Sequence, residues 1–460
     1  MTPDTTLSRP ATVSPDQARN PDYFPGFATA IPLGIQHVLA MFVSNLTPPI
    51  IVAGAAGFGF GSPDPSQLIY MIQMSMLFAG VATLLQTIGM GPIGARLPLV
   101  QGTSFAFISV MIPIVAGKGV GAMATLTTGA LCGGIFHAVL SRFVGRIRFA
   151  LPPLVTGLVV LMIGLSLMRI GVQYSAGGVT AIGTPAFGAG LSWLLAGVVV
   201  VVTLGLKFFG RGIWSTASVL LGLLAGYGLA MAMGRIDFSP VGHAGWIMLP
   251  MPFHFGLDLS ASAIIGFCLT GFVSSIETIG DVEVICENTA GRRATDRELE
   301  GAVAADGVGT ALSAIFGAMP NTTFSQNVGL IAMTGVMSRH VVTLGAVFLV
   351  VCGLLPRIGA VITTIPIEVL GGGVIVMFGM VASSALSMLS AVEWNQRNML
   401  IFGVALSLSL GLQLEPEALS HLPETARMLL TSGVVPAAVI AVVLNLLLPL
   451  EVGRPVRAAG

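Results

Sequence analysis

The chain has 460 residues, of which 54% are hydrophobic and only 9% are charged, against about 25% charged residues in soluble domains. This composition and a mean hydropathy of +0.93 exclude a soluble globular protein and predict a polytopic membrane protein. The formal net charge of zero identifies no charged partner, and we expect the lipid bilayer, not nucleic acid, to surround the chain.

The two ends of the chain are polar. Residues 1–23 lack an apolar core, so they do not resemble a cleavable signal peptide, and we expect a disordered cytosolic tail there. Residues 451–460 are expected to form a second cytosolic tail.

Between the tails the sequence predicts about fourteen apolar segments. They span 27–51, 67–90, 99–116, 120–142, 149–172, 190–208, 214–235, 259–285, 299–318, 323–338, 340–356, 367–390, 398–413 and 430–450. A full membrane crossing needs about 20 residues. The third and tenth segments fall short once their polar openings, QGTSF and PNTTFSQN, are set aside.

Basic residues predict the orientation, because cytoplasmic loops are enriched in Lys and Arg. With the N-terminus inside, one side of the membrane carries Arg96, Arg142, Arg146, Arg148, Lys207, Arg211, Arg292, Arg293, Arg297, Arg339, Arg397, Arg454 and Arg457. The other side keeps Lys118, Arg235, Arg357, Arg427 and the acidic residues Glu415, Glu417 and Glu424. We therefore expect both termini in the cytosol of a plasma membrane protein, the inner membrane in a bacterium.

The two short segments stand seven segments apart, at corresponding positions in opposite orientations. Such a pair of polar-interrupted segments is the sequence sign of an inverted-repeat transporter with a binding site near the midplane. Their openings, Gln101–Phe107 and Asn321–Asn327, predict short extended pieces that meet each other and offer backbone groups to a substrate.

The tenth segment also carries a specific motif, Gln-Asn-x-Gly-x-x-x-x-Thr, formed by Gln326, Asn327, Gly329 and Thr334. It resembles the signature of the nucleobase–ascorbate transporter family, and Gln36-His37 is similar to the family's motif in the first helix. The resemblance implies an all-α fold of fourteen segments in a seven-plus-seven inverted repeat, with short β pieces in segments three and ten. It also implies a homodimer, a core domain (24–145 and 255–358) and a gate domain (146–240 and 359–450).

Isolated carboxylates inside apolar helices are functional candidates, because an unpaired charge at that depth is costly. Glu277 is one, with structural ion pairing as the alternative. Asp281 lies one turn further on the same face, and Asp306 stands alone in segment nine. For both Asp residues the alternative is a role in positioning helices. His37 is expected either to make a structural hydrogen bond or to assist coupling.

The resemblance implies which residues bind substrate. Glu277 and Gln326 match the family's substrate pair, and a carboxylate with an amide complements the donors and acceptors of an oxidised purine. Ser104 and Phe105 match positions where a backbone N–H and an aromatic ring hold the base. Ser325 is a further substrate-binding candidate.

Asn327 and Thr334 are expected to support the site. One departure is Glu368, where the family commonly has proline, and we expect it at the outer end of its helix.

The isolated carboxylates and the family resemblance together imply proton-coupled import of a purine, and Gln326 at the first signature position is similar to that of xanthine or uric acid carriers. The resemblance implies an elevator motion of core against gate. We expect the proton to be the coupling ion, with no other cofactor and no metal. Alternatives are a uracil or other nucleobase symporter, and an anion exchanger or channel of the same architecture. An enzyme is disfavoured, because the six histidines show no ligand-like spacing.

Overall fold

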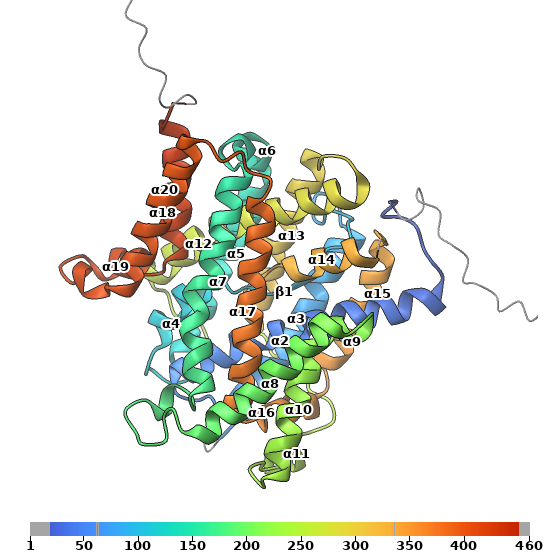
Figure 1. Cartoon of the computed structure of the whole chain (residues 1–460), viewed down its shortest axis with the longest axis vertical. Helices are drawn as coiled ribbons and strands as arrows, with labels where there is room; N and C mark the ends of the chain where they lie inside the picture. Colours follow the sequence, from blue (N-terminus) through green and yellow to red (C-terminus); the bar gives the residue numbers. More distant parts are fainter. Residues whose placement is uncertain (1–18, 61, 63, 335, 450–460) are drawn as a thin grey trace, which may run out of the picture.

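The computed structural model describes residues 19–449 except 61, 63 and 335, and no side chains at 288 and 332–334. Nearly all described regular structure is helical (Figure 1). The first half contains α2 (Phe27–Ala56), α3 (Ser66–Ile88), β1 (Gln101–Thr103), α4 (Ile108–Val115), α5 (Ala122–Leu140), α6 (Val144–Ile147), α7 (Pro153–Ser175), α8 (Gly190–Phe209), α9 (Ile213–Thr216), α10 (Ser218–Ala232) and α11 (Ser239–His243). The second half contains α12 (Ala261–Ile285), α13 (Asp296–Ile315), β2 (Asn321–Thr323), α14 (Ser325–Thr334), α15 (Arg339–Gly353), α16 (Pro356–Thr363), α17 (Ile367–Leu389), α18 (Gln396–Leu414), α19 (Glu424–Leu430) and α20 (Val434–Leu447).

Each of the fourteen predicted segments has a counterpart in the structure. Within the described residues, eight helices are long and apolar enough to cross a membrane, and two bent pairs, α15–α16 and α19–α20, each bend by 78°. The remaining segments are α10, α13 and the two strand–helix pieces, β1–α4 and β2–α14. The polytopic membrane fold predicted from the composition is therefore confirmed.

The two polar-interrupted segments meet as predicted. Strands β1 and β2 pair antiparallel at the centre of the bundle, with Gln101 opposite Thr323 and Thr103 opposite Asn321 (Figure 1). Both strands are completely buried. A non-helical backbone is tolerated at membrane depth only where its polar groups are paired or line a cavity. The pairing satisfies this requirement and places the N-terminus of the short helix α14 in the interior.

Helix packing repeats between the halves. Helix α2 packs on α15, and its counterpart seven segments later, α12, packs on α5. Helices α3 and α13 are also counterparts: α3 packs on α15, and α13 packs on α5. Likewise α8 packs on α10, and its counterpart α18 packs on α20. Helices α7 and α17, which are counterparts of each other, share the most extensive contact and run side by side (Figure 1). This reciprocity is the structural form of the inverted repeat.

Close helix contacts depend on glycine, as small residues permit close approach in membranes. A Cβ added to Gly307 of α13 would lie 2.2 Å from the Ala138 amide nitrogen on α5. We expect Gly307→Ala to separate the two helices and lower the melting temperature of the purified protein by several degrees. Gly403→Ala is the matched control, because a Cβ there meets nothing within 4 Å. Equal melting temperatures for the two variants would contradict this account.

Candidate functional site

Asp306 ties the paired strands to the helices around them. Its carboxylate accepts hydrogen bonds from the Gln101 amide on β1 and from the Thr278 hydroxyl on α12. The Thr323 hydroxyl on β2 is 3.5 Å from the same carboxylate and accepts from the Gln101 amide at 3.2 Å. Both carboxylate oxygens of Asp306 are thus engaged within the protein. The contacts match the positioning alternative for this residue, and its part in transport remains a prediction.

The other end of β1 is held by Asn45 of α2. Its side-chain oxygen accepts from the Thr103 amide at 2.9 Å, and its backbone carbonyl accepts from the Thr103 hydroxyl at 2.7 Å. The Asn45 amide donates to the carbonyl of Ser75 on α3 at 3.3 Å. Both ends of the strand pair are therefore anchored by buried side chains from neighbouring helices, and the strands form a platform next to α14.

His37 and Asn327 lie in contact, as expected for a histidine that bonds across to the signature helix. The Asn327 side-chain nitrogen donates to the His37 carbonyl at 3.0 Å and lies 3.2 Å from His37 Nδ1. Both residues are buried. The contact links α2 to α14 near the start of the short helix. A coupling role for His37 remains a prediction.

A cavity of about 350 Å³ opens beside this platform, within the volume range of small-molecule sites. One wall comes from α12 and α14 and includes Asp281, Ser325 and Gln326. The opposite wall comes from α8 to α10 and from α17, and it includes Lys207, Thr216, Ser218, Ser383, Ser384 and Ser387. The cavity therefore lies between the two groups of helices that the family resemblance implies as core and gate.

Only one of the two carboxylate oxygens of Asp281, a residue that lines this cavity, has a described hydrogen-bond donor. The Ser325 hydroxyl donates to Asp281 Oδ2 at 2.9 Å, while Asp281 Oδ1 is buried without a partner among the described residues. Gln326 is half-buried at the cavity wall. A fully buried carboxylate oxygen is costly unless a donor or a proton reaches it. A donor such as a ring N–H would satisfy this oxygen.

Glu277 lies one turn before Asp281 on α12 and does not line the cavity. It is 8% exposed, and its Oε2 is buried without a partner in the described part of the chain. Glu277 forms no ion pair with the described residues, so the structure does not support the alternative that its carboxylate serves structural ion pairing. The structure thus brings Gln326 together with Asp281 and Ser325, and the predicted pairing of Glu277 with Gln326 remains a prediction.

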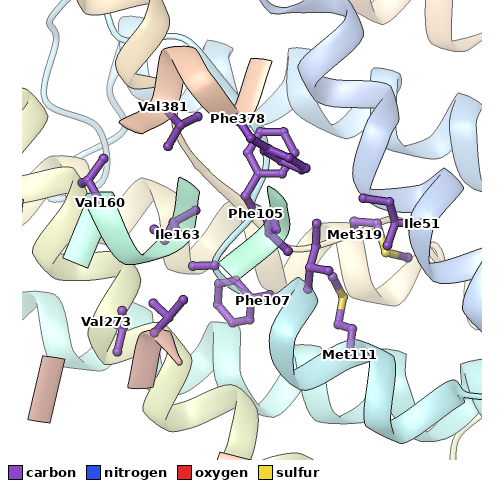
Figure 2. Close-up of a cluster of buried hydrophobic side chains, with 14 of the residues drawn as sticks. Ile51, Phe105, Phe107, Met111, Val160, Ile163, Val273, Met319, Phe378 and Val381 are labelled. Atoms are coloured by element: carbon purple, nitrogen blue, oxygen red, sulfur yellow. The ribbon is translucent and has the colours of Figure 1, made fainter. Parts of the chain in front are cut away.

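Ser104 and Phe105 follow β1 directly. The Ser104 amide donates to the Pro320 carbonyl at 2.8 Å, so this N–H is already used within the fold, and the Ser104 hydroxyl is buried without a described partner. The Phe105 ring packs in an apolar cluster, edge-on to Phe378 with centroids 5.4 Å apart (Figure 2). Phe105 does not line the cavity, and base stacking on its ring stays a prediction.

Two further residues were named from the sequence, Thr334 and Glu368. Helix α14 ends at Thr334, whose side chain lies outside the described residues. Glu368 occupies the first turn of α17, at the end opposite the cavity serines. Its carboxylate lies 3.5 Å from the Arg235 guanidinium and accepts from the Ser192 hydroxyl at 3.4 Å. Glu368 therefore joins helix ends on one side of the protein, away from Gln326.

The sequence reasoning missed the wall opposite Gln326. Lys207 was used only for orientation, and the serines of α17 were not singled out. A signal was present, because Ser383, Ser384 and Ser387 interrupt the apolar second half of the helix at spacings of three and four residues. Thr278 and Gln101 were also missed, although both are polar and sit beside predicted site residues.

Known proteins match this chain along nearly its whole length. The family model described as the permease family matches residues 28–418. A xanthine permease of Bacillus subtilis is 36% identical, covering 92% of this chain and 94% of its own length. A uric acid permease of Bacillus subtilis is 35% identical and covers 91% and 92%. A xanthine permease of Escherichia coli is 36% identical and covers 90% and 91%.

Solved structures share the fold at low sequence identity. The transmembrane domain of a cyanobacterial bicarbonate transporter has a TM-score of 0.59 at 13% identity, covering 91% of this chain and 98% of that one. The murine solute carrier 26 family member A9, an anion transporter, has a TM-score of 0.60 at 12% identity, covering 91% and 68%. The relatives by sequence are permeases and none of those described is an enzyme. The chain is therefore a multi-pass membrane permease and belongs to the nucleobase–ascorbate transporter family.

Proposed function

We propose that the protein is a proton-coupled symporter that imports an oxidised purine, xanthine or uric acid. The observation that carries this proposal is a cavity lined by Gln326, Ser325 and Asp281, whose buried Oδ1 has no partner among the described residues. Oxidised purines present adjacent N–H donors and carbonyl acceptors. A carboxylate accepts the N–H bonds, and the Gln326 amide both donates and accepts.

The relatives support the substrate class, because xanthine and uric acid permeases match this chain over nine-tenths of its length. Uracil or another nucleobase is the alternative, since these bases also carry N–H donors and carbonyl acceptors, in a different pattern. An anion exchanger is the second alternative on fold grounds. It would be expected to place a cation or bare helix N-termini at the site rather than a carboxylate, whereas this cavity is lined by the carboxylate of Asp281 as well as by Lys207.

The proposed cycle is an elevator motion of a core, α2 to α5 with α12 to α15, against a gate, α7 to α10 with α17 to α20. The extensive packing of α7 on α17 supports a gate that holds together, and the cavity lies between the two groups. We propose a homodimer through the gate, in a bacterial inner membrane with both termini in the cytosol.

Uptake of labelled xanthine by cells expressing the protein, in competition with a panel of unlabelled bases, tests the substrate class. We expect xanthine and uric acid to compete at the lowest concentrations and uracil to compete weakly. Competition by uracil or bicarbonate at concentrations below those of both purines would overturn the assignment.

The proton gradient is expected to drive accumulation. The buried carboxyl groups Glu277, Asp281 and Asp306 can carry a proton across the site, as intramembrane carboxylates do in proton-driven carriers. We expect a protonophore to abolish accumulation of labelled purine, and replacement of sodium by choline to leave it unchanged. Accumulation that requires sodium and survives the protonophore would contradict proton coupling.

A further inference from the structure

The wall opposite Gln326 has a chemistry of its own. Ser383, Ser384 and Ser387 line the cavity from one side of α17, because Ser387 follows Ser383 by four residues and Ser384 by three, the spacings that are neighbours on a helix. Ser383 and Ser387 are exposed on that face, and none of the three hydroxyls makes a hydrogen bond within the described part of the chain. Free hydroxyls in an apolar membrane helix are available to a polar ligand.

Lys207 supplies a positive charge to the same cavity. It lies in the last turn of α8 and is exposed, and the wall across from it holds Gln326 and Asp281. The ammonium makes none of the described ion pairs. It therefore faces the cavity as a cation whose charge is not neutralised by a described neighbour.

A second observation points to a ligand between the two walls. Asp281 is fully buried, its Oδ1 has no described partner, and the residue lines this same cavity. A ligand that meets both walls needs N–H donors on the edge toward Asp281 and acceptor oxygen or negative charge on the edge toward Lys207 and the serines.

Uric acid has that distribution. It carries an oxygen on C8 where xanthine has only hydrogen, and at neutral pH it has lost a proton and is an anion, whereas xanthine is largely uncharged. We propose that Lys207, with Ser384 and Ser387, forms a subsite on α8 and α17 that selects the anionic, C8-oxygenated purine uric acid over xanthine. This inference rests on the proposed purine transport and assigns the selection between two purines to residues outside α12 and α14.

Direct binding of labelled uric acid and labelled xanthine to detergent-purified protein tests the subsite. We expect Lys207→Gln to weaken uric acid binding about threefold to fivefold, the range for an exposed charge, and to leave xanthine binding unchanged. Lys207→Arg should restore uric acid binding because it keeps the charge. The loss should shrink in high salt, where an exposed charge is screened.

The chain has two lysines, and the second provides a matched control. Lys118 lines a different cavity, so Lys118→Gln should change neither affinity. The double variant Ser384→Ala, Ser387→Ala should lower uric acid affinity more than xanthine affinity, because the lost hydroxyls no longer donate to the C8 oxygen.

The outcomes separate this inference from the proposed function. If the parent protein binds both purines and Lys207→Gln leaves their affinity ratio unchanged, the subsite is wrong and purine transport stands. An equal loss of both ligands in Lys207→Gln also overturns the selection. If the parent protein binds neither purine, the proposed function fails and this inference fails with it.

Discussion

Glu277→Gln is expected to abolish accumulation of purine while leaving the protein folded. The residue is nearly fully buried in α12 and its Oε2 has no described partner, so the wild-type carboxylate has an acceptor free for a donor. An amide of the same size offers a single acceptor oxygen and cannot take up or release a proton. Uptake of labelled xanthine into cells, with expression quantified on purified membranes, measures the loss.

Glu287→Gln is the matched control, since Glu287 is exposed just beyond the C-terminal end of the same helix. We expect that variant to accumulate purine normally. Near-normal accumulation by Glu277→Gln at equal expression would remove Glu277 from both the binding and the coupling roles. It would then leave Asp281, which lines the cavity, as the carboxylate to test next.

Gln326→Glu is expected to weaken xanthine and uric acid binding by about tenfold to a hundredfold. The substitution removes an amide N–H, and a substrate carbonyl left without its donor costs about 1–3 kcal/mol. The new carboxylate would also share the cavity with Asp281, and the like charges repel unless one is protonated. Uracil, whose donor pattern differs, should lose less affinity or gain some.

Binding of each labelled base to purified protein checks this prediction. Gln396→Glu is the control, because Gln396 is exposed at the start of α18 and is remote from the cavity lining. If the xanthine and uric acid affinities of Gln326→Glu stay within about twofold of the parent, Gln326 does not contact the ligand and the proposed recognition fails.

The sequence predicted the membrane fold and its repeat because these follow from local properties. Apolar runs near 20 residues mark crossings wherever they occur, and two short runs with polar openings mark the paired strands. The antiparallel pairing of Gln101–Thr103 with Asn321–Thr323 was therefore predictable as a meeting of two segments. Its register was not, because it depends on Asp306, Asn45 and Thr278 from three other helices.

The composition of the site was only partly predictable. Gln326 belongs to the motif, Ser325 directly precedes it, and Asp281 stands out as a charge in an apolar helix; all three line the cavity. The motif does not indicate which residues of other helices line the cavity together with Gln326. Lys207 precedes Gln326 by more than a hundred residues, and two helices, α15 and α16, separate α14 from the helix that carries Ser384. A serine in a membrane helix has the same sequence signal whichever way its face points.

Only the tertiary structure decided which polar groups are already satisfied. Asp306 and Asp281 are both isolated acidic residues in apolar sequence, yet hydrogen bonds engage both oxygens of Asp306 while Oδ1 of Asp281 is left without a described partner. The Ser104 amide is likewise used by the Pro320 carbonyl. A residue's type determines what it can donate or accept, whereas its availability to substrate depends on neighbours brought in by distant segments. The sequence therefore determined the membrane architecture and the motif, and packing determined which of its polar atoms remain free.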